Sequence, residues 1–145
     1  MQDSIERDVE VAAPPARVWE ALTDYRQFGQ WFRVDLENPF AIGEVTRGVT
    51  TFPGYEGHRW ISITRVMEAE AVFAFDWPHG EGDEAASGPM TRVTFRLEPV
   101  SGGTLVHIAE TGFMGLPEDA RMEALRSNTK GWEIQAGNIK AYVGG

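Results

Sequence analysis

Between residues 33 and 116 the sequence contains no helical stripe of apolar residues, only short extended segments separated by glycine, proline and acidic residues. Alternation with a period of two predicts strands, and it is clearest at Phe73/Phe75/Trp77 and at Val106/Ile108. The connections are too short for crossover helices, which favours an antiparallel meander. The expected strands lie near Val34–Glu37, Glu44–Phe52, Gly57–Glu68, Glu70–Trp77, Thr91–Pro99 and Thr104–Phe113.

Helical patterns occur only on either side of this region. After a first strand at Asp3–Val11, Pro14-Pro15 is suited to begin a short helix, and Thr23 or Asp24 can cap a second one. Near residue 117 a proline followed by two acidic residues is typical of a helix start. The long helix expected from there to the end of the chain has this apolar stripe: Met122, Leu125, Thr129, Trp132, Ala136, Ile139 and Val143.

Two glycines, Gly131 and Gly137, lie inside this long helix. Each costs about 1 kcal/mol of helix propensity relative to alanine. Close packing of the helix against the sheet would account for them, and so would local fraying.

This order of elements predicts an α+β fold with a curved antiparallel sheet of six or seven strands around a long C-terminal helix. Two short helices follow the first strand, and residues 1–145 are expected to form one domain. A helix lying along a curved sheet leaves a volume between them. Either side chains or a bound ligand must fill this volume.

Composition removes several classes of function. With 22 acidic residues against 13 basic ones, the formal charge of -9 makes nucleic acid an unfavourable partner. The longest apolar run, Ala71–Phe75, is far shorter than a membrane span, and the first residues resemble no targeting segment, so we expect a cytoplasmic protein. Cysteine is absent, which removes thiolate nucleophiles and cysteine metal sites.

No cofactor is expected, because the chain has neither a phosphate-binding loop nor a dinucleotide fingerprint. The segment His79–Glu84 combines one imidazole with three carboxylates and superficially resembles a metal site. Its glycines argue against an ordered site, because metal ligands need supporting contacts. We therefore expect no metal.

Several segments resemble one known superfamily. They are Val11 to Asp24, the aromatic pair Trp31-Phe32, the strand Ala71–Trp77, the run from Gly102 to Phe113, and the late Gly131-Trp132. Together they are similar to the helix-grip (SRPBCC) superfamily of Bet v 1, START domains and polyketide cyclases, and most of all to its Hsp90-ATPase-activator-like branch. The resemblance spans nearly the whole chain. It implies a cavity-bearing domain but does not choose among carriers, receptors, enzymes and co-chaperone modules.

Glu110 is the strongest polar candidate. It shares strand parity with Val106 and Ile108, so alternation directs its carboxylate into the apolar space beneath the long helix. The resemblance also implies a cavity-facing His or Glu at this position. Desolvation would raise the pKa of this carboxyl, which suits a general acid or base or a ligand-binding group. A structural role, with the carboxylate meeting water or an arginine near the strand end, is the alternative.

Aromatic residues could line a pocket, although core packing is the alternative role for each of them. Arg47 and His58 could meet across neighbouring strands and hold a carboxylate-bearing ligand, or they could lie at a solvated strand end. The full set of candidate ligand-binding residues is Trp31, Arg47, His58, Trp60, Phe73, Phe75, Trp77, Val106, Ile108, Glu110, Trp132, Ala136 and Ile139.

We therefore expect a protein that binds an apolar or amphipathic small molecule between the sheet and the C-terminal helix, with Glu110 orienting it. Two further hypotheses stay open. One is a cyclase-type or hydrolase-type enzyme in which Glu110 moves a proton while His58 or Arg47 stabilises developing charge. The second is a protein-interaction module with an Hsp90-type partner, as the name of the branch implies. A homodimer is also possible.

Overall fold

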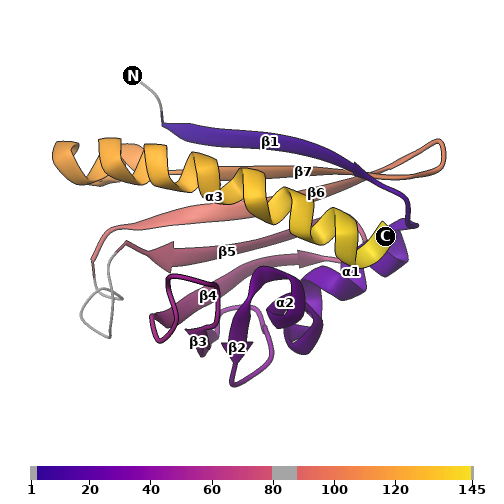
Figure 1. Cartoon of the computed structure of the whole chain (residues 1–145), viewed down its shortest axis with the longest axis horizontal. Helices are drawn as coiled ribbons and strands as arrows, with labels where there is room; N and C mark the ends of the chain where they lie inside the picture. Colours follow the sequence, from indigo (N-terminus) through magenta and orange to yellow (C-terminus); the bar gives the residue numbers. More distant parts are fainter. Residues whose placement is uncertain (1–2, 80–87, 145) are drawn as a thin grey trace.

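Seven antiparallel strands form one sheet in the order β1-β7-β6-β5-β4-β3-β2 (Figure 1). The computed structural model describes residues 3–79 and 88–144. Consecutive strands from β2 to β7 are neighbours, while β1 pairs with β7 at the opposite edge from β2. The strands are β1 (Ser4–Val11), β2 (Val34–Leu36), β3 (Val45–Thr50), β4 (Arg59–Glu68), β5 (Val72–Pro78), β6 (Met90–Val100) and β7 (Gly103–Thr111). The expected meander is confirmed.

The helices cover one face of the sheet. After β1 come α1 (Pro15–Thr23) and α2 (Tyr25–Phe32), and the long α3 (Glu118–Gly144) crosses the sheet diagonally beside them (Figure 1). A one-turn helix, η2 (Phe113–Gly115), links β7 to the segment that leads into α3. The α+β helix-grip architecture is therefore confirmed. Within the described ranges, no helix has the length and hydropathy needed to cross a bilayer.

Local chemistry explains the boundaries of the two short helices. Pro15 stands at the start of α1, where its missing N–H costs nothing. The Asp24 side chain accepts a hydrogen bond from the Arg26 backbone N–H and caps α2. Arg33 then takes the left-handed conformation, with φ of 72°, and ends α2 just before β2.

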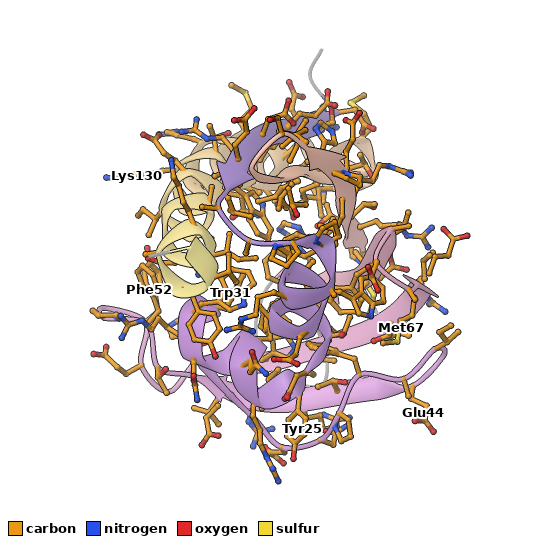
Figure 2. All side chains as sticks on the ribbon, turned by 90° about the vertical axis from the view of Figure 1, so that its right-hand side faces the viewer. Tyr25, Trp31, Glu44, Phe52, Met67 and Lys130 are labelled. Carbon is orange, nitrogen blue, oxygen red and sulfur yellow. The ribbon has the colours of Figure 1, made fainter. Side chains whose placement is uncertain are left out.

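Aromatic rings fill most of the space between the helices and the sheet. Trp31 is directed inward from α2, whereas Tyr25, Glu44, Met67 and Lys130 lie at the periphery (Figure 2). The Phe28 ring lies 4.9 Å from the Trp31 ring and 5.8 Å from the Trp60 ring, measured between centroids. Such edge-to-face packing is favourable beyond the area it buries. Aromatic rings in mutual contact therefore occupy much of the centre of the described structure.

Several strand ends differ from the expectation for identifiable reasons. β5 begins at Val72 rather than at residue 70, because Glu70 has a φ of 59° and belongs to the turn after β4. β7 ends at Thr111 because Gly112, with a φ of 96°, turns the chain into η2. β3 and β4 are also shorter than expected, and their connecting loop spans residues 51–58.

The buried face of α3 differs from the expected stripe. Met122 and Thr129 are exposed, whereas Asn128 and Gln135 turn toward the protein. Trp132, Ala136 and Ile139 lie in the core as expected. Of the two explanations for Gly131 and Gly137, close packing does not apply, because a Cβ at either position would meet nothing within 4 Å.

Candidate functional site

The Glu110 side chain is fully buried on the inner face of the sheet. It lies on β7 in the same orientation as Val106 and Ile108, so the inward direction predicted from strand alternation is confirmed. Glu110 pairs with Val93 on β6, and Thr91 lies two residues before Val93 on the same face. Thr91 in turn pairs with Trp77 on β5. Strand register therefore brings the side chains of Glu110, Thr91 and Trp77 together.

Four side chains donate hydrogen bonds to the Glu110 carboxylate. The Trp132 Nε1–H donates to Oε1 at 2.9 Å, and the Trp77 Nε1–H donates to Oε2 at 2.9 Å. The Thr91 hydroxyl donates to Oε2 at 2.5 Å, and the Asn128 Nδ2 group lies 3.0 Å from Oε1 and 3.2 Å from Oε2. Both oxygens are thus saturated by donors from β5, β6 and α3.

The direction of the Glu110 pKa follows from this environment. Burial raises the pKa, but the neighbouring His79 ring and the hydrogen bonds from Thr91, Trp132 and Trp77 lower it by more. The net pKa lies below the ordinary value, so Glu110 is an anion at neutral pH. The raised pKa expected from desolvation alone is therefore wrong, because that expectation omitted the donors.

His79 joins this cluster from the residue after β5. Its Nε2 lies 2.8 Å from the Thr91 hydroxyl oxygen and 3.6 Å from Glu110 Oε2. The imidazole ring packs edge-on against Phe113, with 5.8 Å between centroids. His79 is mostly buried, with 18% of its side chain exposed.

A groove of about 610 Å³ opens directly beside the cluster. It lies between α3, the end of β5 and the loop that joins β3 to β4. Four of its lining residues, Trp77, His79, Asn128 and Trp132, are the ones that contact Glu110 from the groove side. The remaining lining residues are Phe32, Thr50, Phe52, Tyr55, His58, Pro78, Ser127, Lys130, Gly131, Ile134 and Gln135.

Three of the sequence-predicted binding residues line this groove: His58, Trp77 and Trp132. Glu110 lies behind its wall. The rest of the apolar set are core residues instead, because rings and aliphatic chains pack over them: Trp31, Trp60, Phe73, Phe75, Val106, Ile108, Ala136 and Ile139.

Arg47 does not reach the groove. It is exposed on the outer face of β3, opposite Ile61 of β4, and shares that face with Val45 and Val49. Of the two alternatives for Arg47, a position on the solvated face of the sheet fits this placement, and a ligand site shared with His58 does not. The inner face of β3 carries Gly48, whose missing side chain lets β2 approach closely.

Sequence reasoning missed several groove residues, notably Phe32, Phe52, Tyr55 and Asn128. Sequence reasoning singles out His79 only as part of the segment His79–Glu84, which superficially resembles a metal site. Residues 80–84 of that segment lie outside the described residues. The parity of His79 with Trp77 is a usable signal, since residues two apart on a strand share a face. Across residues 3–79 and 88–144, no three His, Asp or Glu side chains gather as a metal site would require.

Comparison with known proteins assigns the family. The family model described as activator of Hsp90 ATPase homolog 1-like protein matches residues 12–144. The chain belongs to this family. No curated protein matches the chain.

Solved structures show that the family fold is shared widely. DynU16, from the dynemicin biosynthetic locus, is 26% identical over 98% of this chain, with a TM-score of 0.77, although the match covers only 47% of DynU16. Protein MLL2253 from Mesorhizobium loti is 18% identical, with 96% and 95% of the two chains covered and a TM-score of 0.78. The Aha1 dimer from Colwellia psychrerythraea is 15% identical, with 98% and 96% covered and a TM-score of 0.74. The last two similarities concern the fold alone.

Proposed function

We propose that this protein binds an apolar or amphipathic small molecule with a flat aromatic part in the groove beside α3. The observation that carries the proposal is the groove of about 610 Å³ whose inner wall is made by Trp77 and Trp132. Their rings lie 5.8 Å apart at a tilt of 34°, and hydrogen bonds to Glu110 hold both indoles in place. Fixed aromatic surfaces of this kind suit planar apolar ligands.

The polar groups of the groove suit a ligand with an acidic or anionic end. The described lining residues include Lys130, His58 and His79 but neither aspartate nor glutamate, although the whole chain carries 22 acidic residues. These basic side chains can meet an acidic group of the ligand, while the negative charge of Glu110 lies behind the wall and is held by its own donors. An amphipathic ligand would place its rings against the indoles and its charged end toward these basic side chains.

The structure gives less support to Glu110 as a direct proton carrier. A general acid must hold a proton at working pH, and the lowered pKa of Glu110 leaves it ionised. Both oxygens are also occupied by donors, and the side chain is fully buried. Glu110 is better suited to hold the indoles and His79 in position than to react with a ligand.

The interaction-module and homodimer hypotheses rest on similarity alone. An Hsp90-type partner follows only from the family description, and a homodimer only from the Aha1 dimer among the solved structures. Both stay predictions.

Gly131 offers a direct test of the groove, because it lines the groove and has open space where a Cβ would lie. We expect the fluorescent probe anilinonaphthalene sulfonate to bind the wild type and to raise its melting temperature. Probe at 100 times its Kd should add about 2.7 kcal/mol to the free energy of unfolding. Gly131→Leu should weaken this binding at least tenfold by filling the groove.

Gly137→Leu is the matched control, because Gly137 lies on the same helix, is exposed and also has open space around it. It should bind the probe like the wild type. Equal binding by wild type and Gly131→Leu would overturn the groove as the site. Native mass spectrometry of freshly purified protein complements the test by detecting a small molecule that denaturation releases.

A further inference from the structure

The hydrogen bonds around Thr91 determine which nitrogen of His79 carries a proton. A threonine hydroxyl has one hydrogen to donate and two lone pairs to accept with. The Thr91 hydrogen goes to Glu110 Oε2, 2.5 Å away, because an ionised carboxylate can only accept. The Thr91 oxygen must then accept from its remaining neighbours, the Trp77 indole N–H at 3.0 Å and His79 Nε2 at 2.8 Å.

His79 Nε2 is therefore a donor, and the neutral imidazole has its lone pair on Nδ1. Among residues 3–79 and 88–144, no hydrogen-bond partner of Nδ1 is found, while the ring itself lines the groove. The second ring nitrogen is thus the polar atom of His79 that a bound molecule can use. The buried Glu110 carboxylate thus fixes the tautomer of His79, and it does so mostly through the Thr91 hydroxyl that lies between them.

We propose that His79 Nδ1 is the proton acceptor of the groove, and that the bound molecule is an aromatic compound with an acidic hydroxyl, a phenol or an enol. This inference rests on the proposed function, because it places the hydroxyl of a ligand whose ring lies on the indole wall. Trp77 and Trp132 supply that wall, and His79 lies at its edge.

The proton transfer balances without any further reactant. The ligand O–H bond breaks, its electron pair stays on oxygen as a phenolate or enolate, and a new N–H bond forms at His79 Nδ1. The resulting imidazolium has the Glu110 carboxylate 3.6 Å from its Nε2. This ion pair stabilises the charged product, so Thr91 and Glu110 are positioning residues and His79 is the group that touches the ligand.

Two more basic groups line the groove and could act on the same ligand. His58 lines the opposite side and packs against Tyr55, with 5.9 Å between ring centroids, and Lys130 lines the α3 side. The test must therefore separate a specific effect of His79 from a general effect of positive charge.

The experiment uses para-nitrophenol, which is yellow only as the phenolate, together with para-nitroanisole, its methyl ether, which has no proton to give. Both should quench indole fluorescence in the wild type, with the phenol binding about three- to tenfold more tightly through one added hydrogen bond. The ionisation midpoint of the bound phenol should fall by about one pH unit or more, because an imidazolium forms beside it.

His79→Gln is the decisive variant, since its amide can still donate to Thr91 but cannot take up a proton. It should lose the preference for the phenol over para-nitroanisole and the shift of the phenol's ionisation midpoint. His107→Gln is the matched control and should keep both, because His107 pairs with Glu6 and Asp8 and does not line the groove. A loss in His58→Gln as large as that in His79→Gln would overturn the specific role of His79. Thr91→Val, which removes the hydroxyl between His79 and Glu110, should reduce the shift.

The outcomes distinguish the two proposals. If both probes bind but the phenol midpoint is unshifted, or is shifted equally in His79→Gln, the inference about His79 is overturned and the groove is still a binding site. If neither probe binds, the proposed function fails and the inference fails with it. Melting curves of each variant show whether a lost signal reflects unfolding.

Discussion

At the scale of single residues, Glu110 is the one carboxylate that is fully buried among the described residues, and donors surround it. A desolvated anion is tolerated only when its hydrogen-bonding capacity is filled. Donors on β5, β6 and α3 fill the hydrogen-bonding capacity of Glu110. Two of these donors are the indole N–H groups of Trp77 and Trp132. Glu110 therefore links the two indoles of the groove wall to the core.

Glu110→Gln should destabilise the protein markedly. The amide replaces one acceptor oxygen with an NH2 group that faces donors, and each donor left without a partner costs about 1–3 kcal/mol. Urea denaturation measures the change in the free energy of unfolding. The control is Glu98→Gln on the exposed face of β6. Its free energy of unfolding should lie within about 0.5 kcal/mol of the wild-type value. Equal effects of the two substitutions would contradict the structural role of Glu110.

The same variant has a pH signature. The folded pKa of Glu110 is lowered, so its contribution to stability is complete above the ordinary carboxyl value of 4.5 and is lost as pH falls through the folded value. The stability difference between wild type and Glu110→Gln should therefore be largest near neutral pH and shrink below about pH 4.5. A difference that grows in acid would show that the folded pKa is raised instead.

At the scale of elements, one substitution should have opposite effects in two helices. Gly131 in α3 has open space where a Cβ would lie, so Gly131→Ala should stabilise the protein by about 1 kcal/mol through helix propensity. In α2 a Cβ on Gly29 would lie 2.3 Å from the Val34 carbonyl oxygen, which is backbone and cannot move aside alone. Gly29→Ala should therefore destabilise by about 1–3 kcal/mol.

Thermal unfolding of the two variants measures both signs directly. Gly137→Ala, with open space like Gly131, is the control for propensity in α3 and should also stabilise. A stabilised Gly29→Ala would show that α2 and β2 are not in close contact. A destabilised Gly131→Ala would show that side chains pack tightly around this part of the groove wall.

At the scale of the whole molecule, the surface is strongly acidic, with a formal charge of -9, while the groove lining contains none of the acids among its described residues. The helices and sheet meet in a core filled by aromatic rings, so the open volume lies at one end of the interface rather than at its centre.

Self-repulsion of this charge predicts a salt dependence. Raising sodium chloride from about 0.01 M to about 0.15 M shortens the Debye length from about 30 Å to about 8 Å, which screens the repulsion between surface carboxylates. The melting temperature should therefore rise over this range, as measured by differential scanning fluorimetry. Adding a nonionic solute of equal osmolarity is the control. A falling melting temperature would mean that attractive pairs, such as Asp76 with Arg65 and Arg92, outweigh the net repulsion.

Patterns between neighbouring residues along the chain predicted where the strands and helices lie. Alternation predicted the strands and the inward direction of Glu110. Proline and acidic residues at the helix starts, together with the spacing of apolar residues, predicted α1, α2 and α3. These predictions succeeded because neighbours along the chain decide which face of a strand or helix a side chain occupies. Local patterns left the role of Arg47 open, and strand register decides it by placing Arg47 on the exposed face of β3 opposite Ile61.

The surroundings of Glu110 and the position of the open volume depend on how distant segments pack together. Trp77 and Trp132 stand 33 and 22 residues away from Glu110 along the chain, so their hydrogen bonds depend on strand register and on the placement of α3. Those donors reverse the direction of its pKa shift, and the packing of rings closes the centre of the interface. Both are properties of how distant segments meet, which a local pattern does not contain.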